Sequence, residues 1–370
     1  MNCRPLCLAV AASLFAGLSS CAGPRQGLES APWLQFEWPE ADLLFQRDKF
    51  WVGGDGAYSI DLGNGRVLWL FGDSWIDPTG TGSRDRATMV SNTLALQNGY
   101  DPSRATAEFY WGTTPSGQAG AFFPDFDGGR YWPGHGLRVE DRLLLFLMEV
   151  RPSDEGLGFE VADWEAVLVT NPDEDPPDWE FEWLETPENR GQIIIGSGSV
   201  LSRGGFVYAF GAQEPGPRQH VYLVRWRTED VLRGGLEGME WWGGNDRGWL
   251  PDSDTGFGAQ PVFSEGQTEF TVHYDENSGD FFEFQTVGFG AAAIVRRTAS
   301  ELTGPWSVPD TVFTPPQVRF PRIMIYQGKA HPHLEGADLV VTYCTNSFDF
   351  GDHTTERWLY YPRFVRVSGP

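Results

Sequence analysis

Five glycine-rich segments, each leading into a short apolar strand pattern, constrain the fold of this chain more than any other feature. Their starting glycines stand at positions 54, 134, 196, 258 and 328, so the steps between them are 80, 62, 62 and 70 residues. Each step has room for about four short strands, and long amphipathic helical patterns are nearly absent. This repetition predicts an all-β fold, a five-bladed β-propeller whose four-stranded antiparallel blades surround a central funnel. A β-sandwich is the alternative, but the spaced glycine-rich starts favour the propeller.

The first repeat contains two aspartates on strands that we expect to be neighbours. Residues 53–59 read GGDGAYS and residues 68–75 read LWLFGDSW, with Asn64-Gly65 between them. Asn-Gly between two apolar runs is a strong hairpin signal. A hairpin would place Asp55 and Asp73 near the same rim of one sheet. Both could also be ordinary turn aspartates, which Gly-Asp-Gly and Gly-Asp-Ser tolerate well.

The N-terminal residues read as a targeting segment rather than as part of the fold. Arg4 precedes an apolar run over residues 6–18, and residues 18–21 read LSSC. This run is too short to span a bilayer and is typical of a signal peptide. The LSSC ending resembles the bacterial lipobox, which predicts a signal peptide over 1–20, lipidation at Cys21 and a tether over 21–32. A plain secretory signal is the alternative.

Residues 33–370 then form a single domain, exported and held at the outer membrane or cell surface by the lipid alone, with the periplasm as the alternative location. Cys344 is the only cysteine left in this part, so no internal disulfide is expected. Its apolar strand context indicates a buried packing residue. We expect the protein to be a monomer.

The net charge of −24 argues against nucleic acids and polyanions as partners, because these require clustered basic residues. The 16 Trp and 26 Phe favour strands and clefts in which aromatic rings stack on sugars.

Several motifs together carry a resemblance to a known family. The segments GDGAYS at 54–59 and WLFGDSW at 69–75 resemble the opening blade of bacterial five-bladed propellers, a domain-of-unknown-function group that includes endo-D-arabinanases. The segments ASELTGPWS at 299–307, VTYCTNS at 341–347 and YPRF at 361–364 are similar to the same group and to arabinanase-like propeller glycosidases. The resemblance spans roughly residues 33–367 and implies a propeller fold and a glycan substrate.

Glycosidic cleavage uses one carboxyl group to protonate the leaving oxygen and a second to activate water or attack directly. The resemblance assigns these catalytic roles to Asp55 and Asp73. Glu269, at the start of the fourth-blade strand, is a candidate third carboxylate, either as the acid or as a residue that tunes the pKa of the acid. Glu149, at the end of a second-blade strand, competes for that role.

Further residues are candidates for binding the substrate. Rings that could stack on sugars include Tyr58, Trp75 and Trp132, although most of the tryptophans must pack between blades. The predicted blade starts bring Asp55, His135, Ser197, Gln260 and His331 to the funnel, with His333 close by. The resemblance adds Asn346 and Arg363 as hydrogen-bonding groups. The expected substrate-binding residues are therefore Tyr58, Trp75, His135, Gln260, His331, Asn346 and Arg363.

No metal or cofactor is predicted. The histidines lack zinc-ligand spacing, and the acidic stretch at 275–280 lacks the last glutamate of a calcium-binding loop. An axial calcium or sodium ion remains compatible with the funnel.

The sequence thus predicts an envelope-anchored glycoside hydrolase that cleaves arabinofuranose-type or related polysaccharides by carboxylate acid–base catalysis. The alternative is a non-catalytic carbohydrate-binding or scaffold propeller on the same anchor.

Overall fold

The computed structural model describes residues 34–368, except residues 155, 215–218, 254–257, 289 and 291. The described residues belong to one compact unit. The predicted signal peptide, Cys21 and tether lie outside them. No helix within the described part of the chain has the length and apolar character needed to cross a bilayer.

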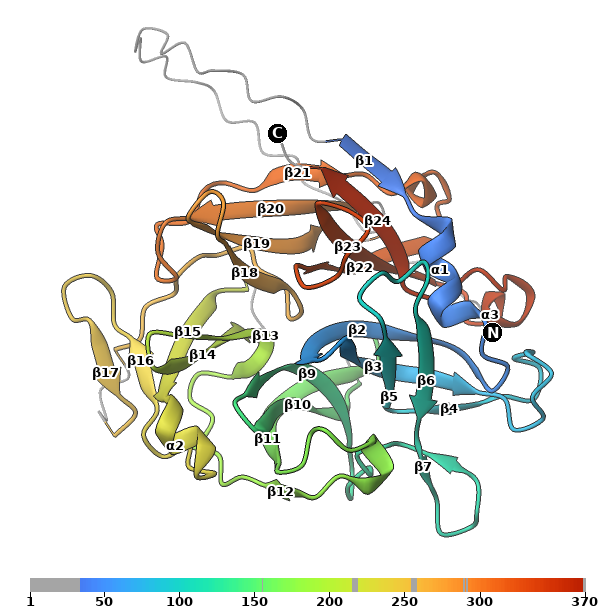
Figure 1. Cartoon of the computed structure of the whole chain (residues 1–370), viewed down its shortest axis with the longest axis horizontal. Helices are drawn as coiled ribbons and strands as arrows, with labels where there is room; N and C mark the ends of the chain where they lie inside the picture. The colour runs from blue at the N-terminus through green and yellow to red at the C-terminus, as the bar shows by residue number, and fades with distance from the viewer. Residues whose placement is uncertain are drawn as a thin grey trace, which may run out of the picture. The chain divides into compact units, whose positions relative to one another are not determined.

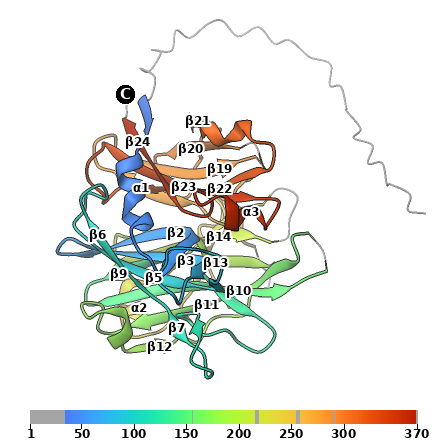
Figure 2. The ribbon, with the colours of Figure 1, turned by 90° about the vertical axis from the view of Figure 1, so that its right-hand side faces the viewer.

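The described unit is an all-β five-bladed propeller, as the repeats predict. Figure 1 shows five antiparallel sheets arranged around a common centre, and Figure 2 shows the same blades from the side. In each sheet the first strand lies innermost, and inner strands of successive blades contact one another around the ring.

The first blade has the order β2-β3-β5-β6, with β4 pairing to β3. Its strands, and the small hairpin that follows them, are β2 (Trp51–Gly63), β3 (Arg66–Ile76), β4 (Thr88–Val90), β5 (Thr93–Asn98), β6 (Thr106–Tyr110), β7 (Gly112–Thr113) and β8 (Ala119–Gly120). The turn between β2 and β3 contains Asn64 and Gly65 with φ values of 55° and 78°. Two consecutive positive φ values define the hairpin turn that Asn-Gly predicts.

The second blade has the order β9-β10-β11-β12 and the third β13-β14-β15-β16-β17. Their elements are β9 (Arg130–Val139), β10 (Arg142–Pro152), β11 (Phe159–Val169), η1 (Pro176–Asp178), β12 (Phe181–Trp183), β13 (Ile193–Arg203), β14 (Phe206–Gln213), β15 (Val221–Arg227), α2 (Thr228–Leu232), β16 (Glu240–Trp242) and β17 (Trp249–Pro251).

The fourth blade has the order β18-β19-β20-β21, and the fifth has the order β22-β23-β24-β1. Their elements are β18 (Thr271–Asp275), β19 (Asp280–Val287), β20 (Ala293–Ala299), β21 (Asp310–Phe313), η2 (Pro316–Arg319), β22 (Ile323–His331), β23 (Leu339–Ser347), α3 (Asp352–Thr355), β24 (Arg363–Ser368) and β1 (Leu34–Glu37).

The glycine-rich segments mark places where the inner strands are irregular and closely packed. The pairing register shifts between Gly54 and Gly56 in β2, and between Ile195 and Val200 in β13. A Cβ atom added to Gly134 would lie 2.4 Å from the carbonyl oxygen of Gly196 on the next blade. Glycine is needed at this position because the backbones of adjacent inner strands are in direct contact and leave no room for a side chain.

One repeat start was placed wrongly from the sequence. The fourth inner strand, β18, begins at Thr271, whereas the segment beginning at Gly258 belongs to the connection from the third blade. Gln260 lies in that connection with an exposed side chain, and its backbone N–H donates to Trp242 O at 2.8 Å. The glycine signal misled because Gly258 approaches the Arg247 side chain rather than a neighbouring inner strand.

The ring is closed where the two ends of the domain meet. β1 pairs antiparallel with β24, and α1 (Pro39–Gln46) then crosses from the fifth blade to the first (Figure 1). Phe45 on α1 is fully buried, and its ring lies 5.0 Å from Trp69 and 5.3 Å from Phe364, centroid to centroid. Trp69 belongs to the first blade and Phe364 to the fifth. The Phe45 side chain therefore packs against both the first and the fifth blade, where the ring closes.

We expect Phe45→Ala to lower the free energy of unfolding by about 3–5 kcal/mol, because it opens a cavity where the first and last blades meet. Chemical denaturation followed by tryptophan fluorescence measures this change. Phe36→Ala is the control, since Phe36 is 60% exposed and its loss should change stability by less than about 0.5 kcal/mol. Equal effects of the two substitutions would contradict this role for Phe45.

Candidate active site

Asp55 lies within the irregular part of β2, and the glycines around it make room for its carboxyl group. Gly56 has a φ of 88°, a left-handed conformation that favours glycine. Across the hairpin, a Cβ atom added to Gly72 would lie 2.8 Å from Asp55 Oδ1. The sequence Gly-Asp-Gly on one strand and Gly-Asp on the next thus creates the space that the Asp55 carboxyl group occupies.

The Asp55 carboxyl group is held by tyrosines from the fifth blade. The Tyr326 hydroxyl donates to Asp55 Oδ2 at 2.7 Å, and the Tyr360 hydroxyl is a second hydrogen-bond partner. Tyr360 also fixes the strand itself, because its carbonyl oxygen accepts from the N–H of Gly54 at 2.8 Å. These contacts bind the Asp55 segment of the first blade to the fifth blade.

Asp73 makes its contacts toward the second blade instead. The indole N–H of Trp132 donates to Asp73 Oδ1 at 2.8 Å, and the Arg130 Nε lies 3.9 Å from the same oxygen. The Asp73 side chain remains 21% exposed. The Trp132 ring also lies within 3.8 Å of a Cβ built on Gly72, the residue against which Asp55 packs. The two carboxylates therefore share one site where the fifth, first and second blades meet.

The environments of the two carboxyl groups differ in charge. Burial is the main reason why the pKa of Asp55 is raised to about 8, and the nearby negative charge of Asp73 is the second. The tyrosine hydrogen bonds lower this pKa and oppose the shift only in part. Burial also raises the pKa of Asp73, but the Trp132 hydrogen bond and the Arg130 charge oppose the shift. The surroundings of Asp55 therefore favour its protonated form, whereas Trp132 and Arg130 favour the ionised form of Asp73.

Glu269 stands beside this pair but is engaged by two side chains of the fifth blade. Lys329 Nζ donates to Glu269 Oε1 at 3.1 Å, and the Gln327 side-chain amide donates to Oε2. The competing residue Glu149 pairs instead with Arg151 at 2.9 Å. Glu269 thus lies near the site, and its negative charge contributes to the raised pKa of Asp55.

Three predicted substrate-binding residues serve inter-blade packing instead. Tyr58 is fully buried, and its hydroxyl donates to Ser197 O at 2.5 Å. His331 is also buried, between the Ser59 and Thr342 hydroxyls. His135 accepts from the N–H of Val200 at 2.9 Å, so its other ring nitrogen donates to Ser59 O. The Tyr58 hydroxyl and the ring nitrogens of the two histidines are thus taken up by protein partners. This corrects the expectations that the Tyr58 ring stacks on a sugar, since the ring is buried, and that His135 and His331 bind substrate hydroxyls.

Other predicted residues lie around Asp73 and the aromatic groups beyond it. Trp75 shares the strand face of Asp73, because residues two apart in a strand point the same way. Its indole N–H donates to His353 Nδ1 at 3.2 Å, and the other ring nitrogen of His353 donates to Asn346 Oδ1 at 2.6 Å. Phe350, which is 56% exposed, lies 5.6 Å from the Trp75 ring. We call Trp75, Phe350 and His353 the aromatic rim.

Arg363 serves the chain closure rather than this site. Its guanidinium lies 3.6 Å from Asp42 on α1 and also donates to Trp358 O at 3.4 Å. The prediction that it binds substrate therefore needs correction, as does the funnel position expected for Gln260.

Sequence reasoning missed Tyr326, Tyr360, Gln327 and Lys329. A signal existed for Lys329, because a lysine inside an apolar blade start, next to Gly328, must find a buried partner. Nothing in the residues around Tyr326 and Tyr360 distinguishes them from packing tyrosines.

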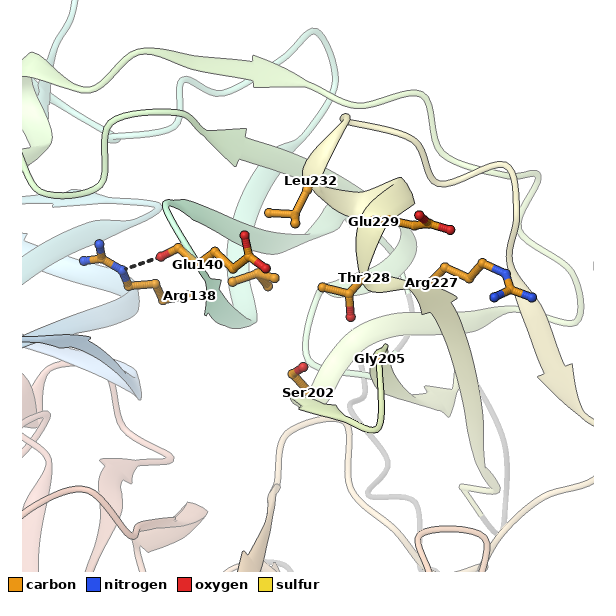
Figure 3. Close-up of a pocket in the computed structure, with 9 residues that line it drawn as sticks. Arg138, Glu140, Ser202, Gly205, Arg227, Thr228, Glu229 and Leu232 are labelled. Carbon is orange, nitrogen blue, oxygen red and sulfur yellow. Dashed lines mark hydrogen bonds between the residues drawn. The ribbon is translucent and has the colours of Figure 1, made fainter.

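A separate cavity of about 510 Å³ lies between the ends of the second and third blades (Figure 3). Its lining includes Arg138 and Glu140 at the far end of β9, whereas Trp132, which contacts Asp73, lies near the start of that strand. The roughly 3.3 Å rise per strand residue puts the two places about 20 Å apart. The cavity is therefore separate from the carboxylates. Among the described residues, no three His, Cys, Asp or Glu side chains form a group that could hold a metal ion.

Comparison with known proteins agrees with this architecture. A model of the family described as Domain of unknown function (DUF5005) matches residues 40–369, so the chain belongs to that family. No curated protein has a significantly similar sequence.

Among the solved structures that are similar to this chain, one shares the fold with a TM-score above 0.5. A provisionally assigned hydrolase from Bacteroides ovatus is 17% identical with a TM-score of 0.71, and the match covers 90% of each chain. An α-L-arabinofuranosidase from Lactobacillus brevis is 14% identical with a TM-score of 0.47, over 86% of this chain and 91% of the other. An α-L-arabinanase from Cellvibrio cellulosa is 12% identical with a TM-score of 0.45, over 86% and 92%.

The pKa of Asp55 predicts how its substitution changes stability with pH. A folded-state pKa of about 8, above the ordinary 3.8, means that the folded protein binds this proton more tightly than the unfolded chain does. Wild-type stability from this group is present below pH 4 and is lost as the pH rises to 8. The stability of Asp55→Asn relative to wild type should therefore rise with pH over this range, by up to about 1.4 kcal/mol per pH unit.

Thermal or urea unfolding between pH 4 and pH 9 measures this difference. Asp173→Asn is the control, because the hydrogen bond from Arg138 lowers the pKa of Asp173, so this group is ionised in both the folded and the unfolded state across this range and its removal should give a difference that does not change with pH. A pH-independent difference between Asp55→Asn and wild type would contradict the burial assigned to Asp55.

Proposed function

We propose that this protein is a glycoside hydrolase that cleaves arabinofuranose-type or related polysaccharides, with Asp55 and Asp73 as its catalytic pair. The observation that carries the proposal is the pair itself: two aspartates on adjacent strands, each held by a different blade, in one partly open site. Glycosidic cleavage needs two carboxyl groups in different protonation states, and their surroundings differ in the required sense.

In the proposed reaction Asp55 is the general acid. Its proton passes to the glycosidic oxygen as the bond to the anomeric carbon breaks, and the tyrosine hydroxyls then donate to the carboxylate that remains. Asp73 supplies the ionised carboxylate, with its charge balanced by Arg130 and its orientation fixed by Trp132. It acts on the anomeric carbon either through a water molecule or directly.

The aromatic rim gives the proposed substrate a surface beyond the carboxylates. Phe350 and Trp75 present rings on the side of β3 that carries Asp73, and aromatic faces stack on the apolar faces of sugars. The choice of arabinofuranose rests on the motif resemblance at 54–59 and 69–75. Export, lipidation at Cys21 and anchoring at the cell envelope are part of the same proposal and rest on residues 1–21.

The proposal is tested with purified protein lacking residues 1–21 and a panel of D-arabinan, L-arabinan and other plant and bacterial glycans. We expect reducing ends to appear with an arabinan. Asp55→Asn and Asp73→Asn should each lower kcat by at least about a thousandfold, because each removes a group that reacts in the transition state.

Asp61→Asn is the matched control. Asp61 lies on the same strand as Asp55 but bonds to Tyr100 near the hairpin turn, so kcat should stay within about twofold of wild type. Cleavage that survives both catalytic substitutions would overturn the assignment of the site. Binding of a glycan without cleavage by wild-type protein would instead favour a carbohydrate-binding propeller.

A further inference from the structure

Gly56, the residue that follows Asp55, has both of its backbone polar groups held by side chains of the fifth blade. The N–H of Gly56 donates to the side-chain oxygen Oε1 of Gln327 at 2.7 Å. The carbonyl oxygen of Gly56 accepts from Lys329 Nζ at 2.6 Å. Within an irregular strand these bonds replace ladder partners that a regular sheet would supply.

Both of these side chains also end on the same carboxylate. Lys329 Nζ lies 3.1 Å from Glu269 Oε1, and the amide nitrogen of Gln327 donates to Glu269 Oε2. A closed ring of hydrogen bonds therefore joins the first, fourth and fifth blades. We call Glu269, Gln327 and Lys329 the Gly56 clamp.

The clamp is held in place by burial. The Lys329 side chain is fully buried, and its ammonium lies 4.2 Å from the centre of the Tyr58 ring. A buried ammonium requires a counter-ion, and Glu269 provides it. Both Glu269 oxygens are already engaged by donors of the fifth blade, as expected for a side chain that fixes its neighbours in place.

The backbone near the clamp adopts conformations that need such support. Gln327 has a φ of 55° and Ala57 a φ of 52°, in the left-handed region that disfavours residues other than glycine. Both residues sit beside the Gly56 contacts. Because Asp55 directly precedes Gly56, the orientation of its carboxyl group depends on these strained segments staying in place.

We propose that the Gly56 clamp positions Asp55 against the site it shares with Asp73, and that Glu269 is a positioning residue rather than a proton donor. The catalytic part of this inference rests on the proposed function, whereas the effect on the Asp55 carboxyl group does not. Glu269 acts in two ways, by fixing the clamp and by placing a negative charge near Asp55.

The first test replaces Glu269 by Gln and follows the Asp55 carboxyl carbon by NMR titration, with Asp55→Asn used to assign the signal. Removal of a nearby negative charge should lower the pKa of Asp55 by at least about one unit. Glu283→Gln is the matched control, because Glu283 forms another buried ion pair of the fourth blade, with Arg297 at 2.9 Å. It should leave the pKa of Asp55 unchanged.

The second test uses kinetics on the glycan that wild-type protein cleaves. Gln327→Met removes one arm of the clamp and keeps both charges, and we expect kcat to fall about tenfold or more with KM within about threefold. Glu269→Gln should retain measurable cleavage, with the alkaline fall of its pH–rate profile moved to lower pH. A loss of at least a thousandfold together with disappearance of that fall would show instead that Glu269 is the acid.

The outcomes separate this inference from the proposed function. An unchanged pKa of Asp55 in Glu269→Gln, or an unchanged kcat in Gln327→Met, would overturn the clamp even if wild-type protein cleaves glycans. A shifted pKa in a protein that cleaves nothing would support the clamp and refute the hydrolase. If circular dichroism shows that both variants are unfolded, the clamp contacts are needed for folding itself. That result would also count against a role in positioning Asp55.

Discussion

The burial of the Asp55 carboxyl group is the constraint on which the rest of the site depends. A carboxyl group between blades is stable only where hydrogen-bond donors reach it and small residues leave room for it. Gly56 and Gly72 provide the room, Tyr326 and Tyr360 the donors, and Asp73 a second negative charge. The same burial that disfavours ionisation lowers the stability of the fold as the pH rises. It also keeps on Asp55 the proton that a general acid would need.

Because the groups that surround Asp55 come from the fifth blade, the site depends on how the ring closes. β1 completes the fifth sheet, and Phe45 packs against both ends of the propeller. Arg363 and Asp42 add an ion pair at the same junction. The Gly56 clamp extends this connection to the fourth blade, so the strand that carries Asp55 is tied into the ring at several points rather than displayed on a free loop.

The local chemistry of the sequence predicted the first blade well. Asn64-Gly65 fixed the hairpin, and the glycine-rich starts marked four of the inner strands because close backbone approach requires glycine there. The fourth start failed because Gly258 serves a connecting loop. Partners at the site were harder to predict: Tyr326 and Tyr360 reach Asp55 only through ring closure, which joins residues 271 or more positions apart. Tyr58 and His331 were misread because neither an aromatic ring near the carboxylates nor a position at a blade start reveals whether the side chain is buried.

The central claim is that one carboxyl group of the pair holds its proton at neutral pH while the other is ionised. Titration of the carboxyl carbons of Asp55 and Asp73 by NMR in the wild-type protein tests this directly. We expect Asp55 to release its proton near pH 8, and Asp73 to do so at lower pH because Trp132 and Arg130 stabilise its ionised form. Titration of both groups together near their ordinary value, or of Asp73 above Asp55, would contradict it.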